Sequence, residues 1–389
     1  KLYIIILESR YKQNTYLLIF YGGIMALNIL ITTAPFGNGH KMVATALKNA
    51  FINKGYNNVF VVDLFTEAHP KITESIKKAY IKSYEFGEAY SILYFGSEKL
   101  TDKKIIEVYR NFGYRKLRDI SKEFKPDVII NTFPILASLK IKNSNGENIP
   151  VFNIVTDFYV HKLWLSEEID KFYIATEELK EELQKLNIPV EKTVVSGIPI
   201  REAFEEAESI SMLYNKYNFK RGKKIVLINS GAFGVFKDIK KVCIELCKDK
   251  NIQVAVVCGN NKTQKERLES LELKNLRVFG YIENIDDLYK ISCCMITKSG
   301  GITLTEALSV QLPLIIIKPV PGQEKENALY FERKGAAIIA NNSYQIINST
   351  IELINNPRLL LAMKKNMKKM YNKSSSMKIV DDVVESMEK

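Results

Sequence analysis

The sequence has little of what marks secreted, metal-binding or membrane-spanning proteins. Its five cysteines are an odd number, and their spacings match neither a zinc site nor a disulfide framework. We therefore expect reduced core thiols in a cytosolic protein. No stretch approaches the roughly 20 uninterrupted apolar residues of a transmembrane helix. Short-period repeats and low-complexity blocks are also absent, which favours ordinary globular domains.

The N-terminal segment, residues 1–24, differs from the rest of the chain. It has two apolar runs broken by Glu8, Arg10 and Lys12, and it lacks a signal-peptide cleavage site. The first methionine is Met25, which directly precedes a strand-like run. We expect the native start at Met25 and an upstream extension, outside the native core, over residues 1–24. The alternative is an arm that touches a membrane.

Positive charge is in excess: 56 lysines and arginines against 44 acidic residues give a net charge of +12. Such a chain attracts anionic partners, which include nucleic acids, anionic membrane surfaces and phosphorylated substrates. The basic residues are scattered rather than gathered in a stripe, so we do not expect a nucleic-acid partner. The charge alone does not choose between the other two.

Strand-like runs bounded by turns alternate with helical patterns along most of the chain, which is typical of parallel α/β layers. The expected strands are residues 27–33, 58–63, 127–131, 150–155, 170–175, 192–196, 224–229, 252–258, 275–279, 292–297, 313–318 and 336–340. The expected helices of the first half are residues 39–54, 70–95, 101–124, 134–143 and 176–187. We predict two Rossmann-like, doubly wound domains that face each other across a cleft.

A polar stretch divides the two series of elements. We expect the first domain at residues 25–199, a linker at 200–222 and the second domain at 223–355. A helical, locally basic tail follows at 356–389. A chain of 389 residues suits two domains, because single domains typically hold roughly 100 to 200 residues.

The stretch "TAPFGNGH" joins the first strand to the first helix. Gly37 and Gly39, on either side of Asn38, allow a tight turn and leave room for a substrate near the helix N-terminus. This is not the G-x-G-x-x-G dinucleotide fingerprint. His40 follows at once, and a neutral imidazole there could act as a general base. Equally, His40 could only orient the start of the helix.

Two further strand ends carry small or acidic residues. In "NIVTDFYVHKLWL", Asp157 follows a strand end, where it could orient a base or a sugar, or only cap the next turn. In "INSGAFGVFK", Ser230, Gly231 and Gly234 form a small-residue loop able to approach phosphate oxygens.

The stretch "ITKSGGITLTEAL" offers a second phosphate-ready helix N-terminus. Ser299, Gly300 and Gly301 lie between a strand and a helix. Glu306, one turn into that helix, could accept both hydroxyls of a ribose or could only complement the helix dipole. Downstream, a rigid proline- and glycine-containing loop presents Gln323 and Glu324, an amide beside a carboxylate, which suits vicinal sugar hydroxyls.

With these motifs together, the chain resembles the glycosyltransferases of the monogalactosyl- and monoglucosyl-diacylglycerol synthase type. It is similar, more distantly, to the transferase that adds N-acetylglucosamine to peptidoglycan precursors. The resemblance covers about residues 27–340, and its stretches are "TAPFGNGH", "LFTEAHP", "VTDFYVHKLW", "FYIATEELKEEL", "VSGIPIREAF", "SGGITLTEAL" and "PGQEKENALYFERKGAA". It implies the two-domain GT-B fold and inverting transfer of a hexose from a UDP-sugar to diacylglycerol.

The resemblance also implies residue roles. His40 would be the base that activates the acceptor, or an acceptor contact, with Asp157 in support. In the second domain Glu306 would hold the ribose, and Gln323 and Glu324 the hexose. The remaining donor contacts would be Gly231, Ser299, Gly300 and Gly301 along the diphosphate, Asn327 nearby, and Tyr281 and Ile282 at the uracil. Many relatives carry glycine at Asn38, so close backbone approach there is less certain.

We expect neither a cofactor nor a metal. Inverting transfer needs one base and stabilisation of the departing UDP, which helix N-termini can supply. The chain also has no Asp-x-Asp pair, the motif with which another transferase design holds Mn²⁺.

An aromatic and basic segment, residues 77–99, is the candidate contact with the membrane and acceptor. Its aromatic residues with this expected role are Tyr80, Tyr84, Phe86, Tyr90 and Tyr94. An amphipathic segment of this kind can lie in a membrane interface, although it could also pack its rings inward. We expect a peripheral enzyme on the cytoplasmic face of the cell membrane, attracted by anionic lipids.

Three other functions fit the same architecture: a UDP-sugar epimerase, an N-acetylglucosaminyltransferase acting on a lipid-linked precursor, and a non-catalytic sugar-nucleotide sensor. The aromatic and basic segment favours the diacylglycerol enzyme, since an epimerase would not need it. We expect glucose rather than galactose as the transferred sugar, because the resemblance is to bacterial enzymes.

Overall fold

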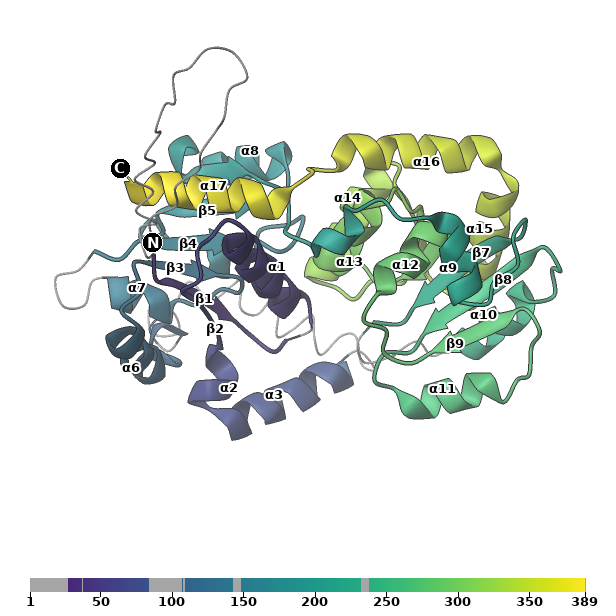
Figure 1. The fold of residues 1–389 in the computed structure, drawn as a ribbon, viewed down its shortest axis with the longest axis horizontal. Helices are drawn as coiled ribbons and strands as arrows, with labels where there is room; N and C mark the ends of the chain where they lie inside the picture. Colours follow the sequence, from purple (N-terminus) through teal and green to yellow (C-terminus); the bar gives the residue numbers. More distant parts are fainter. Residues whose placement is uncertain are drawn as a thin grey trace, which may run out of the picture.

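The structure is a computed structural model that describes residues 27–36, 38–83, 107, 109–142, 148–231 and 238–388. Two α/β domains lie side by side, each built on a six-stranded parallel sheet (Figure 1). The first sheet holds β1 (Ile29–Thr33), β2 (Val59–Asp63), β3 (Val128–Asn131), β4 (Val151–Ile154), β5 (Lys171–Ile174) and β6 (Thr193–Val195). The second holds β7 (Lys224–Asn229), β8 (Ile252–Val257), β9 (Leu276–Phe279), β10 (Cys294–Thr297), β11 (Leu314–Ile317) and β12 (Ala337–Ala340).

Helices connect the strands and cover the sheets. In the first domain they are α1 (Gly39–Asn53), α2 (Leu64–Ala68), α3 (Pro70–Ser83), α6 (Tyr114–Phe124), α7 (Ala137–Lys142) and α8 (Glu177–Lys185). In the second they are α9 (Ile210–Lys216), α10 (Ile239–Leu246), α11 (Lys262–Glu269), α12 (Ile285–Ile291), α13 (Gly301–Ser309), α14 (Gln323–Arg333) and α15 (Ser343–Asn355). The chain ends with α16 (Pro357–Met370) and α17 (Ser375–Glu388).

The strand order reverses once in each sheet. The first sheet has the order β2-β1-β3-β4-β5-β6, so the connections from β1 and from β3 leave in opposite directions. The second has the order β12-β11-β10-β7-β8-β9, with the same reversal between β7 and β10. Such a switch point opens a crevice at the carboxyl ends of the two central strands. Each domain therefore has one preferred place for a ligand.

The central strands are apolar on both faces because helices cover both sides of each sheet. All six residues of β8, "IQVAVV", are buried, and so are all five of β1, "ILITT". Their β-branched side chains suit a pleated, buried surface. These strands form the rigid frame from which the loops of the site project.

The last helix returns to the first domain. In Figure 1, α16 lies along the second domain, and α17 crosses back to lie beside α1. Asp382 of α17 is the anchor, because it accepts hydrogen bonds from Lys171 Nζ at 2.6 Å and from Tyr173 OH at 2.7 Å. The expected tail is thus two helices that belong to different domains.

The expected α/β architecture is confirmed, but one local prediction is wrong. The helix expected at 101–124 does not run unbroken, because Gly113 takes a left-handed conformation with φ of 76° just before α6. A side chain at Gly113 would also collide with Leu64. The expected linker at 200–222 contains α9, whose end is tied to α12 by an ion pair between Lys216 and Asp287.

Some predictions fall outside the described residues. These are the extension at 1–24, Gly37, Gly234, and the aromatic residues Tyr84, Phe86, Tyr90 and Tyr94. Tyr80 belongs to α3. Among the helices of the described ranges, none is both long and apolar enough to cross a bilayer.

Asp382 provides a test of the packing of α17. We expect Asp382→Ala to lower the free energy of unfolding by about 1–3 kcal/mol, because it leaves the buried Tyr173 hydroxyl without its acceptor and removes the carboxylate from Lys171, which keeps Ser386 Oγ at 2.7 Å. Urea denaturation measures this change. The neighbouring Asp381, an exposed partner of Lys54, is the control, and Asp381→Ala should cost less than about 1 kcal/mol. Equal losses in the two variants would contradict the anchoring role.

Candidate active site

The candidate site lies where the switch points of the two sheets face each other. His40 follows β1 and Thr132 follows β3, so both flank the switch point of the first sheet. Ser230 and Gly231 follow β7, and Gly300 lies between β10 and α13, at the switch point of the second sheet. The structure therefore gathers the loops that the sequence motifs had singled out.

His40 has a fixed orientation and a defined proton position. Its Nδ1 lies 2.8 Å from the carbonyl oxygen of Thr132 and 3.1 Å from Thr156 Oγ1. Because a carbonyl oxygen can only accept, Nδ1 carries the proton and donates it to Thr132. In the neutral ring Nε2 then has a lone pair with which it can take a proton from a substrate. Thr156 was expected beside Asp157 at the carboxyl end of a strand, but sequence reasoning gave neither threonine a role.

The environment of His40 keeps its ring uncharged. Burial lowers the pKa of His40 to about 4, although the hydrogen bond to Thr132 opposes this shift. The ring of Phe133 contacts the imidazole edge-on, with 5.0 Å between the ring centroids. At neutral pH the imidazole is thus deprotonated, which is the state that a general base needs.

Asp157 contacts the second domain. Its Oδ1 accepts a hydrogen bond from Asn327 Nδ2 at 2.8 Å, and the residue that contacts His40 is its neighbour Thr156. Burial raises the pKa of the Asp157 carboxyl to about 6, against the hydrogen bond from Asn327. Any support that Asp157 gives to His40 in this arrangement passes through the shared loop.

Asn327 joins the two domains through its side-chain amide. Its Nδ2 donates both to Asp157 and to the Ser299 carbonyl oxygen, while its Oδ1 accepts from the Phe158 backbone N–H at 2.8 Å. The ring of Phe158 also stacks on Tyr330 of α14, with 5.4 Å between centroids. Asn327 is fully buried, and its amide is used in holding the first-domain loop against α14.

Two glycines allow the domains to approach closely. A Cβ on Gly301, the first residue of α13, would lie 2.1 Å from the Thr156 carbonyl oxygen. A Cβ on Gly39 would lie 3.0 Å from Ile302 Cγ1. The N-terminus of α13 therefore lies against the loop that holds His40. Asn38, at the N-cap position of α1, is exposed and makes no side-chain capping bond.

The second-domain side of the site has space at two other glycines. Among the described residues, no atom lies within 4 Å of a Cβ placed on Gly231 or Gly300. The buried Ser230 hydroxyl, next to Gly231, has no hydrogen-bond partner in this part of the chain. By contrast, Ser299 donates its hydroxyl proton to the Glu324 carbonyl oxygen at 2.6 Å, which fixes the start of α14. Space for a ligand at Gly231 and Gly300 thus lies next to an unused hydrogen-bond donor, the hydroxyl of Ser230.

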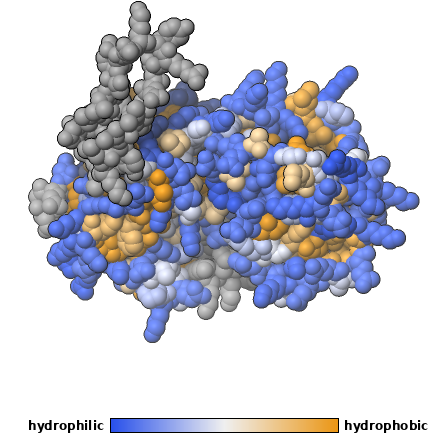
Figure 2. All heavy atoms as spheres, in the orientation of Figure 1, coloured by the Kyte–Doolittle hydropathy of each residue, from blue (hydrophilic) through white to orange (hydrophobic). Residues whose placement is uncertain are grey.

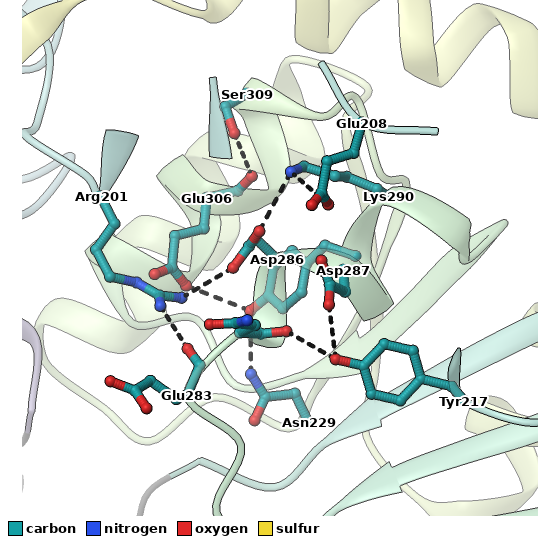
Figure 3. Close-up of polar contacts among 12 residues, drawn as sticks. Arg201, Glu208, Tyr217, Asn229, Glu283, Asp286, Asp287, Lys290, Glu306 and Ser309 are labelled. Atoms are coloured by element: carbon teal, nitrogen blue, oxygen red, sulfur yellow. Dashed lines mark hydrogen bonds and ion pairs between the residues drawn. The ribbon is translucent and has the colours of Figure 1, made fainter. Parts of the chain in front are cut away.

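Glu306 is the centre of a buried polar network, drawn in Figure 3. Tyr289 OH lies 3.4 Å from Glu306 Oε2, and Asn229 Nδ2 donates to the same hydroxyl at 3.0 Å. Burial raises the pKa of Glu306 to about 7, against the nearby positive charge of Arg201. Glu306 is therefore held in place, and burial favours its protonated form.

Arg201 extends from the expected linker into this network. It donates to the Glu283 carbonyl oxygen at 2.5 Å, and it lies 3.8 Å from Asp286 Oδ1 (Figure 3). The loop that contains the exposed Tyr281 and the partly buried Ile282 is thus fixed beside the linker. Sequence reasoning gave Arg201, Tyr289 and Asn229 no role. Arg201 lay within a quoted motif, and Asn229 ends a buried strand.

Gln323 and Glu324 begin α14 after Gly322, whose φ is 110°. Glu324 is buried, and its charge raises the pKa of Asp157 while it opposes the lowering of the pKa of Lys298 by burial. Gln323 is half-buried. Both lie at the same end of the second sheet as Gly300.

Among the described residues, one group of carboxylates is close enough to share a cation: Glu208, Asp286 and Asp287. Two ammonium groups already lie beside it. Lys290 Nζ is 3.2 Å from Asp286, and Lys216 Nζ is 2.5 Å from Asp287. These carboxylates are therefore neutralised by lysines, and the group carries no argument for a metal.

The protonation of His40 is directly measurable. We expect an NMR titration of the three histidines to give His40 a pKa near 4 and a proton on Nδ1 at pH 7. Since this pKa lies below the ordinary value of 6.5, the unfolded chain binds more protons between the two values. The contribution of His40 to stability is thus complete above about pH 6.5 and is lost as the pH falls toward 4. A His40 pKa of about 6.5 or higher would contradict the buried, neutral ring.

Two family models match consecutive parts of the chain. The model of monogalactosyldiacylglycerol (MGDG) synthase matches residues 40–200, and that of the glycosyltransferase family 28 C-terminal domain matches residues 230–383. The boundary between them falls at the expected linker. These two models together cover both sides of the candidate site.

The fold is shared with enzymes of several activities. S. aureus MnaA in complex with UDP has a TM-score of 0.61 at 15% identity, with 92% of this chain and 96% of that chain covered. MurG of Acinetobacter baumannii has a TM-score of 0.60 at 16% identity, with 92% and 99% covered. The UDP-GlcNAc 2-epimerase of Neisseria meningitidis has a TM-score of 0.59 at 16% identity, also with 92% and 99% covered. At such identities the likeness shows the GT-B fold alone.

Curated relatives are much closer in sequence. A processive diacylglycerol beta-glucosyltransferase of Bacillus cytotoxicus is 47% identical over 361 residues, which are 92% of this chain and 93% of the relative. The enzyme of the same name from Bacillus cereus is 46% identical over 360 residues, with the same coverage. This degree of identity over nearly the whole chain shows that the protein belongs to the diacylglycerol glycosyltransferase family, within glycosyltransferase family 28.

Proposed function

We propose that the protein transfers glucose from a UDP-sugar to diacylglycerol with inversion at the anomeric carbon. The relatives named diacylglycerol beta-glucosyltransferase support this acceptor and this sugar, and their description as processive supports successive addition of further sugars. They also favour this function over the two alternative enzymes, since the solved UDP-GlcNAc 2-epimerase shares only the fold.

The observation that carries the mechanism is the hydrogen bond from His40 Nδ1 to the Thr132 carbonyl oxygen. It leaves Nε2 to accept the proton of the acceptor hydroxyl while the hydroxyl oxygen attacks the anomeric carbon of the donor. The bond from that carbon to UDP breaks in the same step, and UDP leaves with the negative charge. Because burial keeps the pKa of His40 at about 4, we infer that the proton moves during the attack rather than before it.

The second domain would bind UDP and stabilise its charge. The N-terminus of α13 offers a positive dipole end to the diphosphate, and Ser230 offers a hydroxyl that has no partner among the described residues. Glu306 would accept the ribose hydroxyls, and Gln323 and Glu324 those of the hexose. The loop of Tyr281 and Ile282 would meet the uracil. Since the helix N-terminus can take the departing charge, this proposal requires neither a metal nor a cofactor.

We also propose that α3 contacts the surface of the membrane. Ile72 and Ile76, one turn apart on α3, are 52% and 41% exposed, and Lys71 lies beside them. Exposed apolar residues among lysines suit the interface of an anionic bilayer. The five unpaired cysteines are typical of a reducing compartment, which supports the cytoplasmic face.

The proposed reaction predicts labelled glycolipid from UDP-glucose and little from UDP-galactose, when diacylglycerol is supplied in mixed anionic vesicles. His40→Ala should lower the rate of transfer about a hundredfold or more, since the base is lost, and should leave UDP affinity unchanged. Radiolabel in organic-extractable lipid measures transfer, and calorimetry measures UDP binding.

His69→Ala is the matched control, and it should keep the transfer rate within about twofold of the unmodified enzyme, because only His40 is placed as a base. Near-full turnover by His40→Ala would remove this residue from the mechanism. Free UDP or an epimerised sugar in place of labelled lipid would overturn the proposed reaction itself.

The membrane contact has a discriminating test, because α3 and α16 lie at opposite edges of the molecule in Figure 1. We expect Ile72→Glu with Ile76→Glu to weaken vesicle binding about tenfold or more, since both apolar side chains leave the interface. Leu361→Glu, at a residue of α16 that is 69% exposed, should leave binding unchanged. Sedimentation with anionic vesicles measures both. Loss of binding only in Leu361→Glu would place the membrane on the opposite face.

A further inference from the structure

Three phenylalanine rings, which we name the aromatic cluster, gather at the carboxyl edge of the first sheet. Phe36 follows β1, Phe65 belongs to α2 directly after β2, and Phe133 follows β3. The three ring centroids lie 5.2 to 5.5 Å from one another. Loops at this edge of a parallel sheet form ligand sites, so three apolar rings there are out of place unless they serve packing or an apolar ligand.

The aromatic cluster adjoins His40. The centroid of the Phe133 ring lies 5.0 Å from that of the imidazole, and Phe36 in turn contacts Phe133. Among the described residues, the wall beside the proposed base is therefore formed by apolar rings, and Phe65 continues it to Phe112, which His69 contacts. A highly polar acceptor, such as a free sugar or a charged peptide, would lose hydrogen bonds to water against this wall without replacement.

Packing of the domain does not account equally for the three rings. Phe65 and Phe133 are packed against the hydrophobic core, whereas Phe36 lies outside the set of described side chains that pack on it. The Phe36 side chain is half-buried, and its ring contacts the other two rings. Its ring thus presents apolar surface at the mouth of the site, at little benefit to the core.

We propose that the aromatic cluster is the acceptor subsite for the apolar part of diacylglycerol, with Phe36 as the residue that determines acceptor affinity. This inference rests on the proposed function. The rings cover the glycerol backbone and the first methylene groups of the acyl chains, because burial of aromatic and methylene surface is favourable. The free hydroxyl at the other end of the glycerol then meets Nε2 of His40.

The test measures acceptor and donor separately. A short-chain diacylglycerol at monomeric concentrations replaces vesicles, so that membrane binding plays no part. We expect Phe36→Ala to raise the KM for this acceptor about tenfold, as one lost aromatic contact does, and Phe36→Leu to raise it less. The KM for UDP-glucose should not change. Thermal unfolding of each variant checks that the fold is intact.

Phe60→Ala is the matched control. Phe60 is a 43% exposed phenylalanine on β2 that packs on Phe124, at the amino end of the same strand that leads to Phe65. This variant should keep the KM of the unmodified enzyme for the acceptor. A specific rise in Phe36→Ala alone supports the subsite.

The outcomes separate this inference from the proposed function. If the unmodified enzyme forms no glycolipid from any diacylglycerol, the proposed function is wrong. If it is active and Phe36→Ala keeps the normal acceptor KM, the subsite alone is wrong and the rings serve only packing. An equal rise of the KM for acceptor and for UDP-glucose also overturns the subsite, because the effect would then extend to the whole cleft.

Discussion

The side-chain amide of Asn327 holds the two halves of the site together. It donates to Asp157 and accepts from the Phe158 backbone, both in the first domain, while it also bonds to the loop after β10 in the second. Together with the stacking of Phe158 on Tyr330, this contact holds the N-terminus of α13 close to His40. Each sheet provides a crevice by its strand order alone, but chemistry between two substrates needs the crevices to face each other. One buried amide, with each of its polar atoms used, sets that geometry.

Burial shifts the pKa of three groups of the site toward their uncharged forms. The pKa of His40 is lowered to about 4, while those of Asp157 and Glu306 are raised to about 6 and 7. At neutral pH His40 is therefore uncharged, whereas Asp157 is largely ionised and is held by Asn327. An anionic diphosphate beside α13 would meet helix N–H groups, whose dipoles are fixed before the substrate arrives. This explains how one site can combine a neutral base with tight binding of a highly charged leaving group.

The fold and the loops of the site could be predicted from the sequence, whereas the contacts between them could not. The apolar runs are strongly periodic, so the strands were predictable, and Gly113 was the one local signal that the helix expected at 101–124 would break. The partners of His40 lie 92 and 116 residues away in Thr132 and Thr156, and no local pattern encodes such pairs. Asn327 was expected near the diphosphate, but its bond to Asp157 exists only because the domains are closed. Roles that depend on contact between the two domains cannot be predicted from the periodicity of the sequence.

The return of α17 to the first domain has a consequence for how the chain is made. Asp382 completes the hydrogen bonds of Tyr173 and Lys171, and α17 covers α1, yet these residues follow the whole second domain in the sequence. The surface of the first domain is therefore closed only after the second domain has been synthesised, whereas the second domain can fold on α16 as soon as that helix emerges. Premature termination near residue 370 would thus leave the second domain whole and the first one uncovered.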